Sequence, residues 1–154
     1  MKKLKVKGVR LWVGTRKGLW TLTAGRTRRK SKLAGPAFLG HTVFHAFPDP
    51  RNPRVVVAAT KTGHLGPTVH RSTDGGKTWK EAKRPPKFTP HPKTGERALE
   101  HVFWLTAGHV SEPGVWYAGT APHGIFHSED GGDTWSAVAG FNDNAMWPRW
   151  SHLG

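Results

Sequence analysis

The octapeptide Ser-x-Asp-Gly-Gly-x-Thr-Trp occurs twice in this 154-residue chain, at residues 72–79 and 128–135. So specific a string does not recur by chance, so the chain is built from repeats, and repeats constrain the fold more than any single residue does. Turn chemistry accounts for every position: the Asp accepts backbone hydrogen bonds, the glycines supply positive φ, and the hydroxyls satisfy other turn groups. We therefore predict a structural role for both copies. The residues given this role are Ser72, Asp74, Gly76, Thr78, Trp79, Ser128, Asp130, Gly132, Thr134 and Trp135.

A calcium loop is the functional alternative for these Asp-containing turns. Each turn offers few carboxylates and lacks the bidentate Glu that calcium loops use. The structural interpretation is therefore favoured for both copies.

Strand-like runs surround both octapeptides and recur near the N-terminus. The three segments that align span 8–22, 54–79 and 114–135. In each, a β-branched or aromatic run ends at a threonine (Thr15, Thr60 or Thr120), and a Gly-containing connection leads into a second short run. One more run precedes the second and third segments. Four strands per unit of about 40–50 residues, in meander order, are typical of a propeller blade, so we predict an all-β fold made of β-propeller blades, each a four-stranded antiparallel meander.

The pattern predicts a single partial propeller over residues 1–154, with about two and a half to three blades and an incomplete ring. The expected parts are blade one at about 8–35, blade two at about 41–84, an insert loop at 85–99, blade three at about 100–140 and the start of a next blade at 141–154. Blade one has lost the octapeptide and keeps only a turn-like Gly25. An open fan leaves exposed sheet edges, so the chain is either a piece of a larger propeller or a possible homo-oligomer whose copies close the ring.

The octapeptide resembles the Asp-box, or bacterial neuraminidase repeat (BNR), of β-propellers. Together with residues 13–19, 66–72 and 124–128, it is similar to the sialidase-like Asp-box repeat proteins labelled exo-α-sialidase or glycosyl hydrolase. The resemblance runs from residue 8 to about 150 and corresponds to the N-terminal part of such a propeller, whose whole length is more than twice that of this chain. It implies the fold far more than the function, because the repeat occurs in sialidases, sortilin-type receptors, xyloglucanases and photosystem assembly factors.

Candidate binding residues follow from the meander. Successive loops alternate between the two ends of a blade, so the loops that join second to third strands lie opposite the octapeptide turns, which is also the ligand face in the family. These loops carry Arg16, Lys17, Lys61, His64 and His123 and no carboxylate. We predict that they bind an anionic ligand, a carboxylate sugar or a phosphate. The alternative is a merely basic surface on a basic protein.

The sialidase mechanism that the resemblance implies needs an arginine triad, a Tyr nucleophile with a partner Glu, and an acid/base Asp. The only tyrosine, Tyr117, lies inside a strand-like run. Glu96, Glu100 and Asp143 fall on the ligand face without recognisable partners. No catalytic residue is assigned, and the chain is expected not to be a sialidase.

Three of the ten histidines, His41, His45 and His101, fall on runs expected to be innermost strands, where they could surround a channel. Their spacing matches no known metal signature, so we predict no metal site and no cofactor.

The formal net charge of +14 favours acidic partners. Nucleic acid is a less favoured partner that the charge still permits, since the aromatic residues follow strand patterns rather than a basic groove. There is no Cys, no apolar run long enough to span a membrane and no signal-peptide core, so we expect a cytoplasmic protein with no membrane partner.

Three functions remain open at this point. The favoured one is a non-catalytic scaffold or binding module for an anionic glycan or protein. The second is a glycoside hydrolase, exo-α-sialidase-like, whose active site is completed by missing blades or by oligomerisation. The third is a non-specific polyanion binder, whose affinity would fall steeply with salt.

Overall fold

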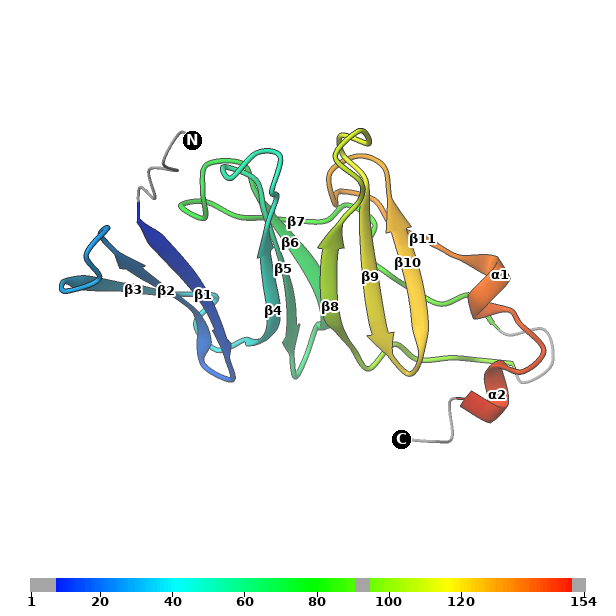
Figure 1. Ribbon diagram of the computed structural model, residues 1–154. Coiled ribbons are helices and arrows are strands. Elements are labelled where there is room, and N and C mark those ends of the chain that lie inside the picture. The colour runs from blue at the N-terminus through cyan, green and yellow to red at the C-terminus, as the bar shows by residue number, and fades with distance from the viewer. Residues whose placement is uncertain (1–7, 91–94, 151–154) are drawn as a thin grey trace.

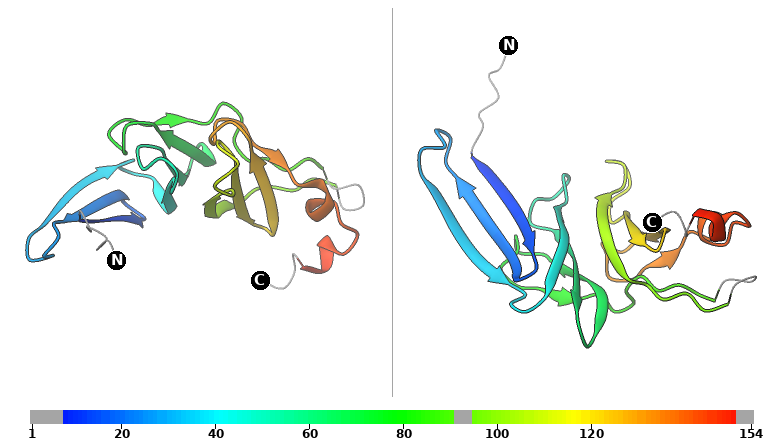
Figure 2. Two further views of the ribbon diagram at one scale, coloured as in Figure 1. Left: turned by 45° about the horizontal axis from the view of Figure 1, so that its top comes forward. Right: turned by 90° about the horizontal axis from the view of Figure 1, so that it is seen from below.

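The computed structural model describes residues 8–90 and 95–150 and is almost entirely β-structure (Figure 1). Its strands form three antiparallel sheets, each a meander of consecutive strands. Blade one contains β1 (Val9–Thr15), β2 (Gly18–Ala24) and β3 (Ser31–Ala37); blade two contains β4 (Thr42–Pro48), β5 (Val56–Thr62), β6 (Gly66–Ser72) and β7 (Lys80–Glu81); blade three contains β8 (His101–Ala107), β9 (Trp116–Ala121), β10 (Gly124–Ser128) and β11 (Ser136–Ala137). The sheets stand side by side and fan out along an arc, as Figure 2 shows from two further directions. The predicted all-β fold of propeller blades is confirmed.

Blades two and three have the expected four strands, but blade one has three. β1 ends at Thr15, the counterpart of Thr60 in β5 and Thr120 in β9, so β1 is a second strand of a blade. Within the described residues, blade one therefore has no counterpart of the innermost strands β4 and β8. Residues 1–7, which precede β1, lie outside the described part.

The main core lies between blades two and three. Alternate residues of β5, among them Val57 and Ala59, point at blade three, where they meet the fully buried Leu105, Ala118 and Phe126. Complete burial of the larger of these side chains, Val57, Leu105 and Phe126, contributes roughly 1.5–3 kcal/mol each. This packing fixes the positions of the loops at both ends of the two blades.

Blade one packs on blade two through aromatic side chains. Trp12 meets the edge of Trp79 at a ring distance of 6.3 Å. Phe38, which follows β3, lies between His70 at 4.7 Å and Trp79 at 4.9 Å. The contact is smaller and less buried than the one between blades two and three.

The two octapeptides form matching turns between the third and fourth strands of blades two and three. In blade two the Ser72 hydroxyl donates to Asp74 at 2.8 Å and the Thr78 hydroxyl donates to Asp74 at 2.6 Å, while the Trp79 indole N–H donates to the Gly76 carbonyl at 3.2 Å. The same three bonds, at 2.9, 2.6 and 3.0 Å, join the corresponding residues of blade three. Both glycines of each turn have positive φ.

The Asp side chains of these turns are held ionised. Hydrogen bonds from the Thr78 hydroxyl, the Thr78 backbone N–H and the Ser72 hydroxyl lower the pKa of Asp74 far below its usual range. At Asp130 burial acts to raise the pKa, but the bonds from Thr134 and Ser128 outweigh it and bring it to about 2. A carboxylate that accepts several hydrogen bonds favours its charged form.

The segment between blades two and three is irregular where it is described, and residues 91–94 lie outside the described part, so the insert loop at 85–99 stays a prediction. It is anchored by Phe88, whose ring packs on Phe126 at 5.2 Å. Arg97 stacks over Phe88 at 4.7 Å and forms an ion pair with Asp143 at 2.9 Å.

After blade three the chain forms two short helices, α1 (Ala139–Asn142) and α2 (Trp147–Trp150), where the sequence suggested the start of another blade. Asn142 exchanges two hydrogen bonds with the backbone of Ile125 and so binds α1 to β10. The assignment of residues 141–154 to a further blade, of which 151–154 lie outside the described part, stays a prediction. No helix in the described part of the chain is long and apolar enough to cross a membrane.

Candidate functional site

The five residues expected to bind an anion lie at the end of the blades opposite the octapeptide turns, on three different blades (Figure 1). Arg16 and Lys17 occupy the β1–β2 turn, Lys61 and His64 lie at the end of β5 and in the turn after it, and His123 lies in the β9–β10 turn. All are exposed except the half-buried Lys61. In the described part of the chain, no hydrogen bond or ion pair joins any two of them, so their binding role stays a prediction.

A hollow of about 290 Å³ lies at the other end, beside the octapeptide turns of blades two and three. We call it the Arg71 pocket. It is lined by Arg71, Thr73, Thr78, Lys80, Glu81, Lys83 and Asp133. All but one of these residues come from blade two and its outer end, and Asp133 comes from the turn of blade three.

Arg71 is the side chain that distinguishes this pocket. It is the residue before Ser72 at the end of β6, and its guanidinium lies against Gly131, where an added Cβ would be 3.1 Å from Nη2. The Nε atom is buried and has no hydrogen-bond partner among the described residues. A buried, unpaired donor on a cation is costly, and a carboxylate or phosphate oxygen is the group that satisfies it best.

The other charges of the pocket are partly paired. Lys83 forms an ion pair with Asp133 at 2.8 Å, and the hydrogen bond and charge of each partner raise the pKa of Lys83 and lower the pKa of Asp133. The charges of Lys83 and Asp133 cancel, as do those of Lys80 and Glu81. The charge of Arg71 therefore gives the pocket a net charge of +1. The pocket therefore favours a small anionic group.

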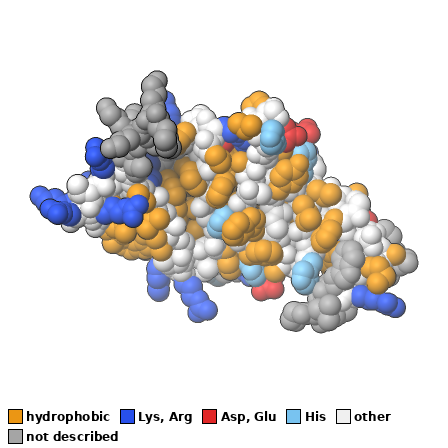
Figure 3. Space-filling view, in the orientation of Figure 1, with side chains coloured by type: hydrophobic (Ala, Val, Ile, Leu, Met, Phe, Trp, Pro, Cys, Tyr) orange, Lys and Arg blue, Asp and Glu red, His pale blue; other side chains and the backbone are white. Residues whose placement is uncertain are grey.

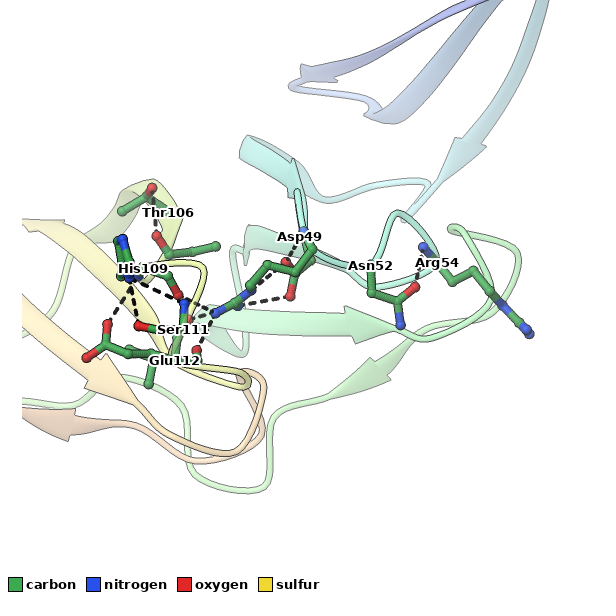
Figure 4. Close-up of polar contacts among 10 residues, drawn as sticks. Asp49, Asn52, Arg54, Thr106, His109, Ser111 and Glu112 are labelled. Atoms are coloured by element: carbon green, nitrogen blue, oxygen red, sulfur yellow. Dashed lines mark hydrogen bonds and ion pairs between the residues drawn. The ribbon is translucent and has the colours of Figure 1, made fainter. Parts of the chain in front are cut away.

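A neighbouring arginine shows what a purely structural arginine looks like in this fold. Arg51, in the turn after β4, donates to both carboxylate oxygens of Asp49 at 2.8 and 2.9 Å. It also donates to the backbone carbonyls of His109, Glu112 and Val115 in the β8–β9 loop of blade three, so its donors hold the two blades together (Figure 4).

Burial acts to raise the pKa of Asp49, but the Arg51 hydrogen bonds and charge outweigh it and lower the pKa. Arg51 is thus fully committed to Asp49 and to blade three, whereas Arg71 is not.

The histidines that could have held a metal make aromatic contacts instead. His45 stacks on Trp104 at 4.5 Å and its Nδ1 accepts the backbone N–H of Leu105 at 3.1 Å, while burial lowers its pKa. His101 stacks on Phe44 at 4.3 Å. No group of three potential metal-binding side chains converges in the part of the chain that the structure describes.

The carboxylates considered for catalysis are not paired for it. Asp143 is bound to Arg97 at 2.9 Å, and Glu100 lies 3.6 Å from His101. Tyr117 lies on β9 with its ring beside His127 at 5.2 Å. None of these contacts brings Tyr117 together with a carboxylate.

Sequence reasoning missed Arg71 because it looked for ligands at the opposite end of the blades. One local signal existed: Arg71 directly precedes an octapeptide, at the position that His127 takes in blade three. Arg71 is a candidate because its Nε is buried without a hydrogen-bond partner among the described residues. That burial depends on blade three lying against Arg71, so it could not be predicted from the sequence of one repeat.

No family model matches this chain, and no curated protein matches it either. Solved structures do. An ancestral GH74 enzyme shares 20% identity at a TM-score of 0.63 over 90% of this chain and 18% of its own. The GH74 xyloglucanase from Xanthomonas campestris shares 19% identity at a TM-score of 0.58, over 87% of this chain and 22% of the xyloglucanase. YCF48 bound to D1 peptide shares 16% identity at a TM-score of 0.51, over 88% of this chain and 41% of YCF48. The chain thus spans from about a fifth to two fifths of these structures and shares their β-propeller fold.

Proposed function

We propose that this chain is a non-catalytic binding module, of the sialidase-like Asp-box type, that takes the carboxylate of an acidic glycan or protein into the Arg71 pocket. The observation that carries this proposal is Arg71, a cation that lines a hollow formed by blades two and three together and whose buried Nε has no hydrogen-bond partner in the described part of the chain.

The size of the pocket fits one acidic group rather than a whole small molecule. Its volume of about 290 Å³ lies just below the usual range of ligand pockets, about 300–1,000 Å³. The hydroxyls of Thr73 and Thr78 line the same hollow, where they can add neutral hydrogen bonds to the charged contact with Arg71. A carboxylate on a side chain, a chain terminus or an acidic sugar would meet these requirements.

Both ligand classes have a source of support. The resemblance to sialidase-like repeats favours an acidic sugar, and YCF48, whose structure is described as bound to a D1 peptide, favours a polypeptide. The shared chemistry is the carboxylate, so the experiment must include both.

A glycoside hydrolase is the weaker alternative. The two carboxylates of the pocket are Glu81 and Asp133, and hydrolysis needs one of such a pair to keep its proton as a general acid. Lys83 lowers the pKa of Asp133, which makes it a poor acid. The shared GH74 fold is what keeps this alternative open.

The test is a titration of the full chain with three ligands: an N-acetylneuraminic acid oligosaccharide, an acidic peptide and its amidated, carboxylate-free counterpart. Arg71→Gln should weaken the affinity for the preferred acidic ligand about 10- to 100-fold, the range expected from the loss of one charge-assisted hydrogen bond. Arg16→Gln removes the same charge at the opposite end and should change affinity less than threefold.

Each other result has a defined meaning. A loss confined to Arg16→Gln would place the site at the opposite end and refute the Arg71 pocket. Equal losses in both variants, with a steep salt dependence and no ligand preference, would indicate a polyanion binder. Release of free sugar that Glu81→Gln abolishes would establish the hydrolase.

A further inference from the structure

Two sheet faces at the ends of the fan carry apolar side chains that the described residues leave partly exposed. On blade one, Arg10 and Trp12 point at blade two, so by strand alternation Leu11 and Val13 point away from it. Leu11 pairs in register with Leu22 and Leu22 with Leu33, which puts all three on that same side. We call these residues the outer face of blade one; Leu11, Val13 and Leu33 are 51%, 42% and 59% exposed.

The outer face of blade three is defined in the same way. Ala118 points into the core between blades two and three, so its neighbour Tyr117 on β9 points away from blade two, beside His127. The ring of Phe103 covers Gly119 on the same side, with its Cζ 3.4 Å from where a Cβ would lie. Phe103 and Tyr117 are 48% and 38% exposed.

The two contacts between neighbouring blades show which part of a following blade packs on such a face. Trp12, three residues before Thr15, packs on Gly76 in the turn of blade two. Val57, three residues before Thr60, packs on Gly132 in the turn of blade three. Tyr117 stands three residues before Thr120 and takes the same place on β9, facing the position of a following blade.

The segments that form the two end blades differ in the sign of their charge, although Lys83 and Arg84 of the preceding segment also lie against the turn of blade three. Residues 8–40 contain no carboxylate, and their basic residues are Arg10, Arg16, Lys17, Arg26, Arg28, Arg29, Lys30 and Lys32. Residues 100–140 contain no Lys or Arg, and their acidic residues are Glu100, Glu112, Glu129, Asp130 and Asp133. Figure 3 shows many basic side chains at the blade-one end, acidic and histidine side chains at the top of blade three, hydrophobic side chains over all three blades, and a further basic side chain at the C-terminal end.

The charges also lie where the two ends would meet. Thr73, in the turn of blade two, shares the Arg71 pocket with Asp133 in the turn of the following blade. Glu129 is the counterpart of Thr73 in blade three, and its side chain is 80% exposed. A following blade would bring its own turn up to Glu129, and the corresponding turn of blade one, between β2 and β3, contains Arg26, Arg28 and Arg29.

We propose that the outer face of blade three binds the outer face of blade one of a second copy of this chain, head to tail, so that two copies close a ring of six blades. A head-to-tail contact between identical chains gives a closed ring when the rotation returns to the start, and propellers of four to eight blades are common. Charge complementarity selects this arrangement, because like ends would place arginine turns or carboxylates against each other. The inference does not depend on the Arg71 pocket.

Size-exclusion chromatography with light scattering on the full chain tests the proposal. The wild type should have a mass of about 34 kDa, twice the 17.0 kDa of one chain. Leu33→Asp and Tyr117→Asp should each halve the mass, whereas Leu65→Asp, which alters an even more exposed leucine in the β5–β6 turn, should leave it unchanged. Near-ultraviolet circular dichroism establishes that each variant is folded.

Two further variants test the direction of the contact. An equimolar mixture of Leu33→Asp and Tyr117→Asp keeps one intact pair of faces and should form a mixed dimer. Glu129→Arg should dissociate the dimer, and the added Arg28→Glu should restore it. A folded monomeric or polydisperse wild type would overturn the proposal, as would a dimer that Leu33→Asp breaks and Tyr117→Asp does not.

Discussion

Replacing Gly76 with alanine should destabilise the contact between blades one and two. Gly76 has φ of 84°, a conformation that costs a residue with a Cβ about 1–2 kcal/mol. The added Cβ would also lie 2.7 Å from Cζ3 of Trp12, so the indole must move and weaken its edge contact with Trp79. Overpacking of this kind costs about 1–3 kcal/mol, which gives a total loss of about 2–5 kcal/mol in the free energy of unfolding.

Two other glycines separate these contributions. Gly75→Ala carries the same strain at φ of 78° but meets only the end of Arg10 at 3.5 Å, so it should lose about 1–2 kcal/mol. Gly63→Ala, with no atom within 4 Å and no positive φ, should be almost neutral. Urea unfolding followed by tryptophan fluorescence gives the three free energies.

A second change removes the obstacle itself. Trp12→Leu costs stability alone, but combined with Gly76→Ala it should cost less than the sum of the single changes, because the clash is gone. If Gly76→Ala loses no more than Gly75→Ala, or if the double change is strictly additive, the inferred contact between Trp12 and the octapeptide turn is wrong.

Three other predictions concern buried charges and titrating groups. Arg51→Ala should cost about 2–4 kcal/mol in urea unfolding, because it leaves Asp49 buried, unpaired and without its contacts to blade three. The pKa of Asp130 is about 2 in the folded chain against an ordinary 3.8, so the unfolded chain binds a proton first and stability should fall as pH drops from about 4 to 2; Asp130→Asn should flatten this slope in urea midpoints measured against pH. Burial lowers the pKa of His45 and His70 below the ordinary 6.5, so the unfolded chain takes up protons at these residues before the folded chain does. The free energy of unfolding should therefore fall as the pH drops below 6.5, and His70→Gln should reduce that fall in the same assay.

Matched variants control each of these. Arg54→Ala removes an exposed arginine three residues from Arg51 and should change stability by less than 0.5 kcal/mol. His64→Gln replaces an exposed histidine in the β5–β6 turn and is the matched control for His70→Gln. A mild effect of Arg51→Ala, an unaltered acid slope in Asp130→Asn, or equal pH curves for both histidine variants would contradict the corresponding prediction.

The parts of the fold that local sequence encodes were predictable. Each octapeptide largely forms its own turn, because the carboxylates of Asp74 and Asp130 bond to described residues within four positions of themselves. Strand alternation and meander order follow from period-two patterns, so blades two and three could be predicted as four-stranded sheets. The two short helices were not, because Asn142 is held by the backbone of Ile125, a contact that no local pattern announces.

The sequence by itself determined that this chain forms propeller blades, since the repeat, its turn and its strand pattern are all written within about 45 residues. Only the tertiary structure decided that the Nε of Arg71 has no hydrogen-bond partner among the described residues while Arg51 has several partners, because both outcomes depend on where blade three lies. The two apolar outer faces also depend on the tertiary structure. The sequence shows that residues 8–40 and 100–140 carry charges of opposite sign, but not that these two segments stand at the two ends of an open fan. Local hydrogen bonds are encoded by neighbouring residues, whereas burial and pairing between blades depend on contacts between segments far apart in the chain.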